Sequence, residues 1–164
     1  MTESAVVHNT FTIERTYAAS PERVFDAFAN NATKRRWFID GHRAKVDEFS
    51  ADFRVGGFEK SSFRFSGGPP GAPPAGTAMA NHTVYLDIVA NERIVFAYTM
   101  LVGAHRMSAS LATVELSASG SGTRLVFTEQ AAFFERSDGA ELRNEGWRAL
   151  LQKLDEVLGV SAAP

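Results

Sequence analysis

The spacing of apolar residues near the C-terminal end predicts a long amphipathic helix over Ser137–Leu158. Its apolar positions recur at intervals of three and four residues, which gathers the side chains on one face of an α-helix. They are Trp147, Leu150, Leu151, Leu154, Val157 and Leu158. Ser137 or Asp138 is placed to cap the first turn and Gly159 to end the helix. A helix with such a face needs a broad apolar partner, and we expect the concave side of a sheet.

Alternation of apolar and polar residues predicts strands upstream of this helix. The first is Thr10–Tyr17, preceded by a flexible N-terminal stretch, residues 1–9. About six more follow, separated by turn residues such as glycine and asparagine. We expect them over Ala44–Phe53, Phe58–Ser66, Thr77–Val89, Arg93–Val102, Arg106–Ser117 and Thr123–Phe133. Short connections between consecutive strands indicate antiparallel pairing.

Two short helices are expected between the first and second strands. The Ser-Pro-Glu sequence at 20–22 has a capping serine, a proline suited to the first helical position and a glutamate that favours the helix dipole. Asn30 or Asn31 then interrupts this helix and begins a second one, which continues through Arg36. The basic residues 34–36 predict a solvated surface near the end of that helix, with an anion site as the less favoured alternative.

The segment 67–76 is GGPPGAPPAG, in which glycine and proline fill eight of ten positions. Such a sequence excludes the interior of a helix or strand. We interpret it as an exposed connection between two strands, or as a flap over a cavity mouth. It lies within a single domain, residues 10–159, because neither side of it holds a complete core. Residues 160–164 form a tail.

This order of elements predicts an α+β fold: one strand, two short helices, about six antiparallel strands and a long helix. A sheet of so many sequential strands curls, and one helix laid across it cannot fill the whole concavity. We therefore expect an internal cavity between the sheet and the helix, closed by the two short helices.

Composition narrows the classes of function. The 164 residues are 45% hydrophobic and 22% charged with a net charge of -2, which is typical of one globular domain and argues against a nucleic-acid partner. The sequence contains no run of about 18 apolar residues and no leader, so we expect no membrane span and a cytoplasmic location. Because cysteine is absent, disulfides and thiolate chemistry are excluded.

Aromatic residues are abundant, with thirteen phenylalanines, two tryptophans and three tyrosines. They form either an aromatic core or the wall of a pocket for an apolar ligand. For the pocket, the expected wall is Trp37, Phe63, Phe65, Tyr85, Phe96, Tyr98, Met100, Phe127 and Trp147.

Glu129 is the candidate for chemistry, because it lies between Phe127 and Phe133 on an otherwise apolar strand face. Facing a cavity, it could act as a general acid or base, or hydrogen-bond a ligand. The structural alternative is a carboxylate paired with an arginine such as Arg106 or Arg64. Glu59 allows the same two interpretations.

The four histidines show no metal-ligand spacing, so we expect no metal site. His82 is placed in a strand where it could line the pocket and orient a ligand, although a structural role is the commoner one for such a histidine. Neither a nucleophile elbow nor a glycine-rich phosphate loop is present, so we expect no cofactor.

Several short segments, spread in order over about residues 10–158, carry a family resemblance. They are ASPERVF at 19–25, WF at 37–38, DFRVGG at 52–57, NERIVF at 91–96, GTRL at 122–125 and GW at 146–147. The chain resembles the helix-grip superfamily that contains START domains and the birch-pollen allergen. Within it, the chain is similar to the branch named for homologues of the heat-shock-chaperone ATPase activator. The resemblance implies a β-α-α-β6-α helix-grip domain whose cavity holds a small hydrophobic molecule.

The superfamily includes carriers, cyclases, receptors and co-chaperone domains, so fold alone leaves function open. The first hypothesis is binding of a small hydrophobic or aromatic ligand. The alternatives are a cyclase-like or hydrolase-like enzyme that uses Glu129, and a chaperone-interacting module. Eukaryotic co-chaperones of this branch carry an additional N-terminal domain with no counterpart here, which argues against direct chaperone activation. The resemblance also allows a homodimer.

Overall fold

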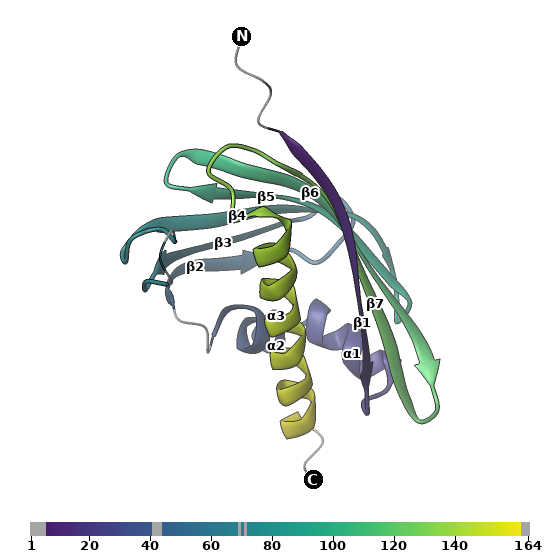
Figure 1. Cartoon of the computed structure of the whole chain (residues 1–164). Helices are drawn as coiled ribbons and strands as arrows, with labels where there is room; N and C mark the ends of the chain where they lie inside the picture. Colours follow the sequence, from purple (N-terminus) through teal and green to yellow (C-terminus); the bar gives the residue numbers. More distant parts are fainter. Residues whose placement is uncertain (1–5, 41–43, 69, 71, 162–164) are drawn as a thin grey trace.

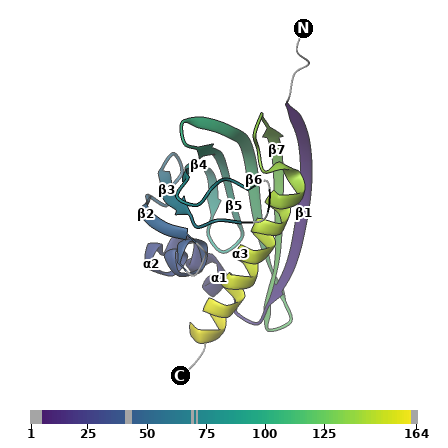
Figure 2. The same ribbon diagram turned by 60° about the vertical axis from the view of Figure 1, so that its left-hand side comes forward.

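A seven-stranded antiparallel sheet curves around the C-terminal helix (Figure 1, Figure 2). The computed structural model describes residues 6–40, 44–68, 70 and 72–161. The elements are β1 (Val7–Tyr17), α1 (Pro21–Ala29), α2 (Asn31–Lys34), the π-helix η1 (Arg35–Ile39), β2 (Ala44–Ala51), β3 (Phe58–Phe65), β4 (Ala78–Val89), β5 (Arg93–Val102), β6 (His105–Ser119), β7 (Gly122–Phe133) and α3 (Gly139–Ser161). This architecture confirms the predicted α+β fold class.

The strand order is β1-β7-β6-β5-β4-β3-β2, so the first strand lies beside the last. Strands β2 to β7 follow one another as sequential neighbours, and β1 pairs with β7 over its full length. Register shifts in the β2–β3, β4–β5 and β5–β6 pairs mark bulges or irregularities, which bend strands and increase twist. The resulting curvature gives the sheet a concave side, across which α3 lies with α1 and α2 at one end (Figure 1).

Capping residues fix the two short helices as predicted. Ser20 accepts a hydrogen bond from the backbone amide three residues later, and Pro21 occupies the first turn of α1. Asn30 caps α2 in the same way. The second helix does not end at Arg36, however, because α2 continues directly into η1 as far as Ile39.

Helix α3 packs with the predicted face toward the sheet. Its buried apolar residues are Trp147, Leu151, Leu154, Val157 and Leu158, while Leu150 is half-buried. The prediction that Gly159 ends the helix is wrong, since the helix continues to Ser161. Arg23 of α1 donates a hydrogen bond to the carbonyl oxygen of Leu158 at 2.7 Å, which supports the last turns in place of a glycine cap.

Strand boundaries differ from prediction by a few residues. Strand β1 begins at Val7 instead of Thr10, because β7 extends far enough to pair with residues 7–9. Residues 1–5 lie outside the described part of the chain. The glycine- and proline-rich segment 67–76 falls between β3 and β4, as expected. Within the described residues, no helix is both long and apolar enough to cross a membrane.

Candidate functional site

A cavity of about 380 Å³ lies between α3, η1 and the concave side of the sheet. Its volume falls within the roughly 300–1,000 Å³ typical of small-molecule sites. Strands β2 to β5 supply one wall, and η1 and one face of α3 supply the other. Leu142 of α3 lines the cavity and is 56% exposed, which places an opening beside the first turns of that helix. No described residue of segment 67–76 lines this cavity.

Most of the predicted wall residues do line this cavity. They are Trp37, Phe63, Phe65, Phe96, Tyr98, Met100 and Trp147. Because they come from η1, β3, β5 and α3, the fold brings together aromatic side chains that are distant in sequence. Both tryptophans of the chain are among them.

Tyr85, Phe127 and Glu129 are buried but lie behind the lining residues. The rings of Phe127 and Trp147 have centroids 4.2 Å apart, so Phe127 supports the tryptophan from the sheet. Tyr85 packs edge-on against Phe96, with centroids 6.3 Å apart. These residues therefore shape the wall without forming its surface.

His82 does not line the cavity, contrary to prediction. Its side chain is exposed, whereas Thr83 and Tyr85 on the same strand are buried. Since successive side chains of a strand point to opposite faces, His82 lies on the outer face of the sheet. His82 was expected to face the cavity because Val84 and Leu86, on the same side of the strand, are apolar. These two residues also point outward, and Leu86 is 48% exposed.

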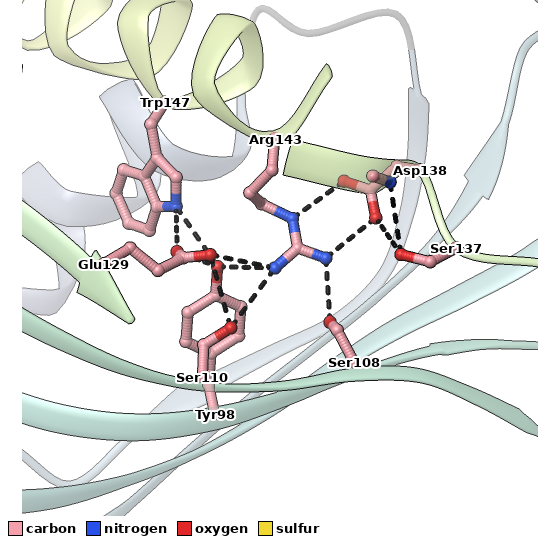
Figure 3. Close-up of polar contacts among 9 residues, drawn as sticks. Tyr98, Ser108, Ser110, Glu129, Ser137, Asp138, Arg143 and Trp147 are labelled. Carbon is pink, nitrogen blue, oxygen red and sulfur yellow. Dashed lines mark hydrogen bonds and ion pairs between the residues drawn. The ribbon is translucent and has the colours of Figure 1, made fainter. Parts of the chain in front are cut away.

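Arg143 of α3 lines the cavity and is the centre of a network of polar contacts (Figure 3). Its Nε and Nη2 donate to the two carboxylate oxygens of Asp138 at 2.8 and 2.9 Å. Nη2 also donates to Ser108 at 2.8 Å, and Nη1 donates to Tyr98 at 3.0 Å and to Glu129 at 3.2 Å. The guanidinium, 5% exposed at the side chain, thus has a protein acceptor on every nitrogen.

Glu129 is fully buried within this network. Its Oε1 accepts from the Tyr98 hydroxyl and from Trp147 Nε1 at 2.9 Å, and its Oε2 accepts from Ser110 at 3.3 Å and from Arg143. Burial raises the pKa of the Glu129 carboxyl, while Arg143 and the hydrogen-bond donors partly oppose that rise. Both oxygens are occupied, so the arrangement orients Tyr98 and Trp147 and offers a substrate no free carboxylate oxygen.

Arg143, rather than Arg106 or Arg64, is the partner of Glu129. Sequence reasoning missed it, although a signal was available. Arg143 is four residues before Trp147 and therefore lies on the same helix face as the apolar stripe. A charged residue on a buried stripe requires a buried partner of opposite charge.

A second polar cluster lies where α2 meets β3 and β4. Lys34 is 4% exposed and donates to Glu59 Oε1 at 2.5 Å, and the Tyr85 hydroxyl donates to the same oxygen at 2.8 Å. The expectation that residues 34–36 are all solvated is therefore wrong for Lys34. Lys34 is three residues before Trp37, so both side chains lie on the buried face of the helix. There the carboxylate of Glu59 compensates the charge of Lys34.

Gly146 lies on the cavity side of α3, one residue before Trp147. A Cβ atom at this position would meet no heavy atom within 4 Å apart from the adjacent residues and the backbone of its own helix. Glycine here is not required for close approach to the sheet, and the absence of a side chain leaves its space to the cavity.

No group of three or more potential metal-ligating side chains was found among the described residues. His8 is in β1, His82 is on the outer face of β4, and His105 contacts the Glu135 carbonyl oxygen at 2.5 Å. His42 lies outside the described residues.

A curved antiparallel sheet, a long helix across its concave side and a cavity between them define a helix-grip protein. The chain belongs to the family of activator of Hsp90 ATPase homolog 1-like proteins, whose model matches residues 18–159. Membership of this family confirms the resemblance found in the sequence.

Solved bacterial structures share both sequence and fold with this chain. Mll3558 from Rhizobium loti is 53% identical, with a TM-score of 0.80 and coverage of 93% of this chain and 98% of that one. A protein from Rhizobium leguminosarum is 35% identical, with a TM-score of 0.82 and coverage of 96% and 99%. CV1439 from Chromobacterium violaceum is 25% identical, with a TM-score of 0.68 and coverage of 92% and 96%. No curated protein matches the chain.

Proposed function

We propose that this protein binds a small hydrophobic or aromatic molecule in the cavity between α3 and the sheet. The observation that carries the proposal is a cavity of about 380 Å³ in the interior of the domain, lined mainly by aromatic and aliphatic side chains. An apolar ligand that leaves water for this space gains roughly 25 cal/mol per Å² of buried apolar surface. A pocket already formed requires little ordering on binding, which favours affinity further.

The binding site offers an internal reporter. Trp37 and Trp147 both line the cavity, so a bound aromatic ligand should change the intrinsic fluorescence of the protein. Native mass spectrometry of the freshly purified protein, compared with its denatured mass, would detect a ligand carried through purification.

Gly146→Leu tests the location of the site. The new side chain would occupy open space in the cavity, so we expect the dissociation constant of the uncharged probe N-phenyl-1-naphthylamine to rise at least about tenfold. Gly159→Leu is the matched control, because Gly159 is also within α3 with no heavy atom near a Cβ, but does not line the cavity. Equal affinities in both variants and the wild type, measured by probe fluorescence, would contradict the proposal.

The alternatives make different predictions. A module that activates a chaperone ATPase, as the family name suggests, would form a chaperone complex that Gly146→Leu leaves intact. An enzyme that uses Glu129 would lose turnover in Glu129→Gln while remaining folded. The geometry supports this enzyme less well than binding, because both carboxylate oxygens of Glu129 already accept two hydrogen bonds each from the protein.

A further inference from the structure

Two buried hydrogen-bonding atoms on β3 and β4 have no partner among the described residues. They are Ser61 Oγ and Asn81 Oδ1. The two residues face each other in the β3–β4 register, and both line the cavity. Ser61 is only 2% exposed. Unpaired polar atoms at such positions cost free energy, and a bound polar group would remove that cost.

Glu59 adds a carboxylate on the same side of β3. It precedes Ser61 by two residues on β3, so the two side chains share the cavity face of the strand. The hydrogen bonds from Lys34 and Tyr85 both end on Oε1. Oε2 takes neither of these bonds, and as a carboxylate oxygen it can accept one from a ligand. We call Glu59, Ser61 and Asn81 the β3–β4 polar patch.

The charges around the cavity select the kind of group that fits this patch. Lys34 is already paired with Glu59, and every nitrogen of Arg143 already has a protein acceptor. An anionic ligand would therefore find no free cation among these lining residues and would face the Glu59 carboxylate. A hydroxyl or amide can donate to Glu59 or Asn81 and can also accept from Ser61.

We propose that the β3–β4 polar patch binds an uncharged hydrogen-bond donor, a hydroxyl or amide, at the polar end of an otherwise apolar ligand. This inference rests on the proposed function, because it assigns the chemistry of the ligand in the same cavity. It predicts selection against apolar carboxylates such as fatty acids.

Three probes with one apolar body test the inference: 2-naphthol, 2-methylnaphthalene and 2-naphthoate. Affinities are measured at neutral pH by displacement of N-phenyl-1-naphthylamine. In the wild type we expect 2-naphthol to bind at least about tenfold more tightly than 2-naphthoate. In Ser61→Ala/Asn81→Leu we expect the affinity for 2-naphthol to fall about tenfold and that for 2-methylnaphthalene to change less than about twofold.

Ser50→Ala is the control, because Ser50 is exposed on the neighbouring strand β2 and does not line the cavity. It should alter none of the affinities. Thermal unfolding provides a second readout: replacing unpaired polar groups by apolar ones should leave the double variant at least as stable as the wild type. A hydrogen-bonding role within the protein would instead make that variant less stable.

The outcomes separate the two proposals. If the wild type binds none of the three probes, the proposed function fails. If the probes bind but 2-naphthoate is equal to or tighter than 2-naphthol, the cavity function stands and the inference is overturned. An equal loss of 2-naphthol and 2-methylnaphthalene in the double variant also overturns it.

Discussion

At the scale of single residues, Arg143 shows how α3 joins the sheet through more than apolar contacts. Its guanidinium contacts two carboxylates and the hydroxyl groups of residues on β5 and β6. A buried ion pair of this kind adds little net stability compared with an apolar pair, because both charges lose their water. Removing one partner is different, since it leaves the other charge buried and unpaired.

Arg143→Met should therefore lower the free energy of unfolding by about 3–5 kcal/mol. The substitution keeps an apolar stem of similar length but leaves the fully buried Glu129 without its cation. Urea unfolding followed by circular dichroism measures the effect. Arg148→Met, at an exposed position of the same helix, is the control and should change stability by no more than about 0.5 kcal/mol.

Adding Glu129→Gln to Arg143→Met should recover part of that loss, because an uncharged amide replaces the unpaired carboxylate. A double variant that is less stable than Arg143→Met would show that the charge of Glu129 is not the source of the cost.

The candidate site was predictable from sequence to different degrees at different residues. Aromatic wall positions such as Phe96 and Trp147 follow from their place on apolar faces, and the cavity includes both. Ser61 and Asn81 gave no such signal, because short polar residues in a strand usually face solvent. Their importance depends on the absence of partners, which only the assembled structure shows.

At the scale of elements, α3 and the curved sheet leave a cavity between them, and Gly146 of α3 lines it. A glycine in the middle of a helix lowers the stability of the folded state, because glycine loses more backbone freedom on folding than any other residue. Here a Cβ atom would contact nothing on the sheet, so glycine is not needed to avoid a clash. It lowers the stability of the helix and leaves the cavity larger.

Gly146→Ala should therefore raise the free energy of unfolding by about 0.5–1 kcal/mol. Gly57→Ala should do the opposite. At Gly57, a Cβ would lie 2.1 Å from the backbone oxygen of Asp52, so that substitution should cost about 1 kcal/mol or more. Paired denaturant titrations measure both values, and a loss of stability in Gly146→Ala would show that the space beside Trp147 is not available.

Most element boundaries were predictable because local signals agree with tertiary packing. Strand β5 begins and ends at the predicted residues Arg93 and Val102. The face of β4 was harder to predict, because Val84 and Leu86 are apolar yet point outward. Apolar pattern alone placed His82 inside, whereas the buried side of β4 carries Thr83 and Tyr85.

At the scale of the whole molecule, three tyrosine hydroxyls of the sheet form hydrogen bonds with the helices. Tyr17 of β1 donates to the Leu151 carbonyl oxygen of α3 at 3.0 Å. The Tyr85 hydroxyl of β4 donates to Glu59 of β3 and accepts from Lys34 of α2. The Tyr98 hydroxyl of β5 donates to Glu129 of β7 and accepts from Arg143 and Trp147 of α3. These are all the tyrosines in the chain, so ionisation of tyrosine reports on the entire structure.

Burial raises the pKa of Tyr17, Tyr85 and Tyr98 above the ordinary value, and the neighbouring carboxylates Glu59 and Glu129 add to the rise for Tyr85 and Tyr98. The folded protein thus holds these protons more tightly than the unfolded chain, in which tyrosine ionises near pH 10. Their contribution to stability is complete below about pH 10 and is lost as the pH rises further.

Unfolding above about pH 10 should therefore release about three protons from tyrosine. The free energy of unfolding should accordingly fall by about 4 kcal/mol for each pH unit. Tyrosinate absorbance and the circular dichroism of the folded state should change together in one transition. Tyr17→Phe should reduce the tyrosine contribution to that slope by about a third. Absorbance that rises near pH 10 while the circular dichroism stays constant would show that the hydroxyls ionise in the folded protein, and that they are not the buried connections between α3, the short helices and the sheet.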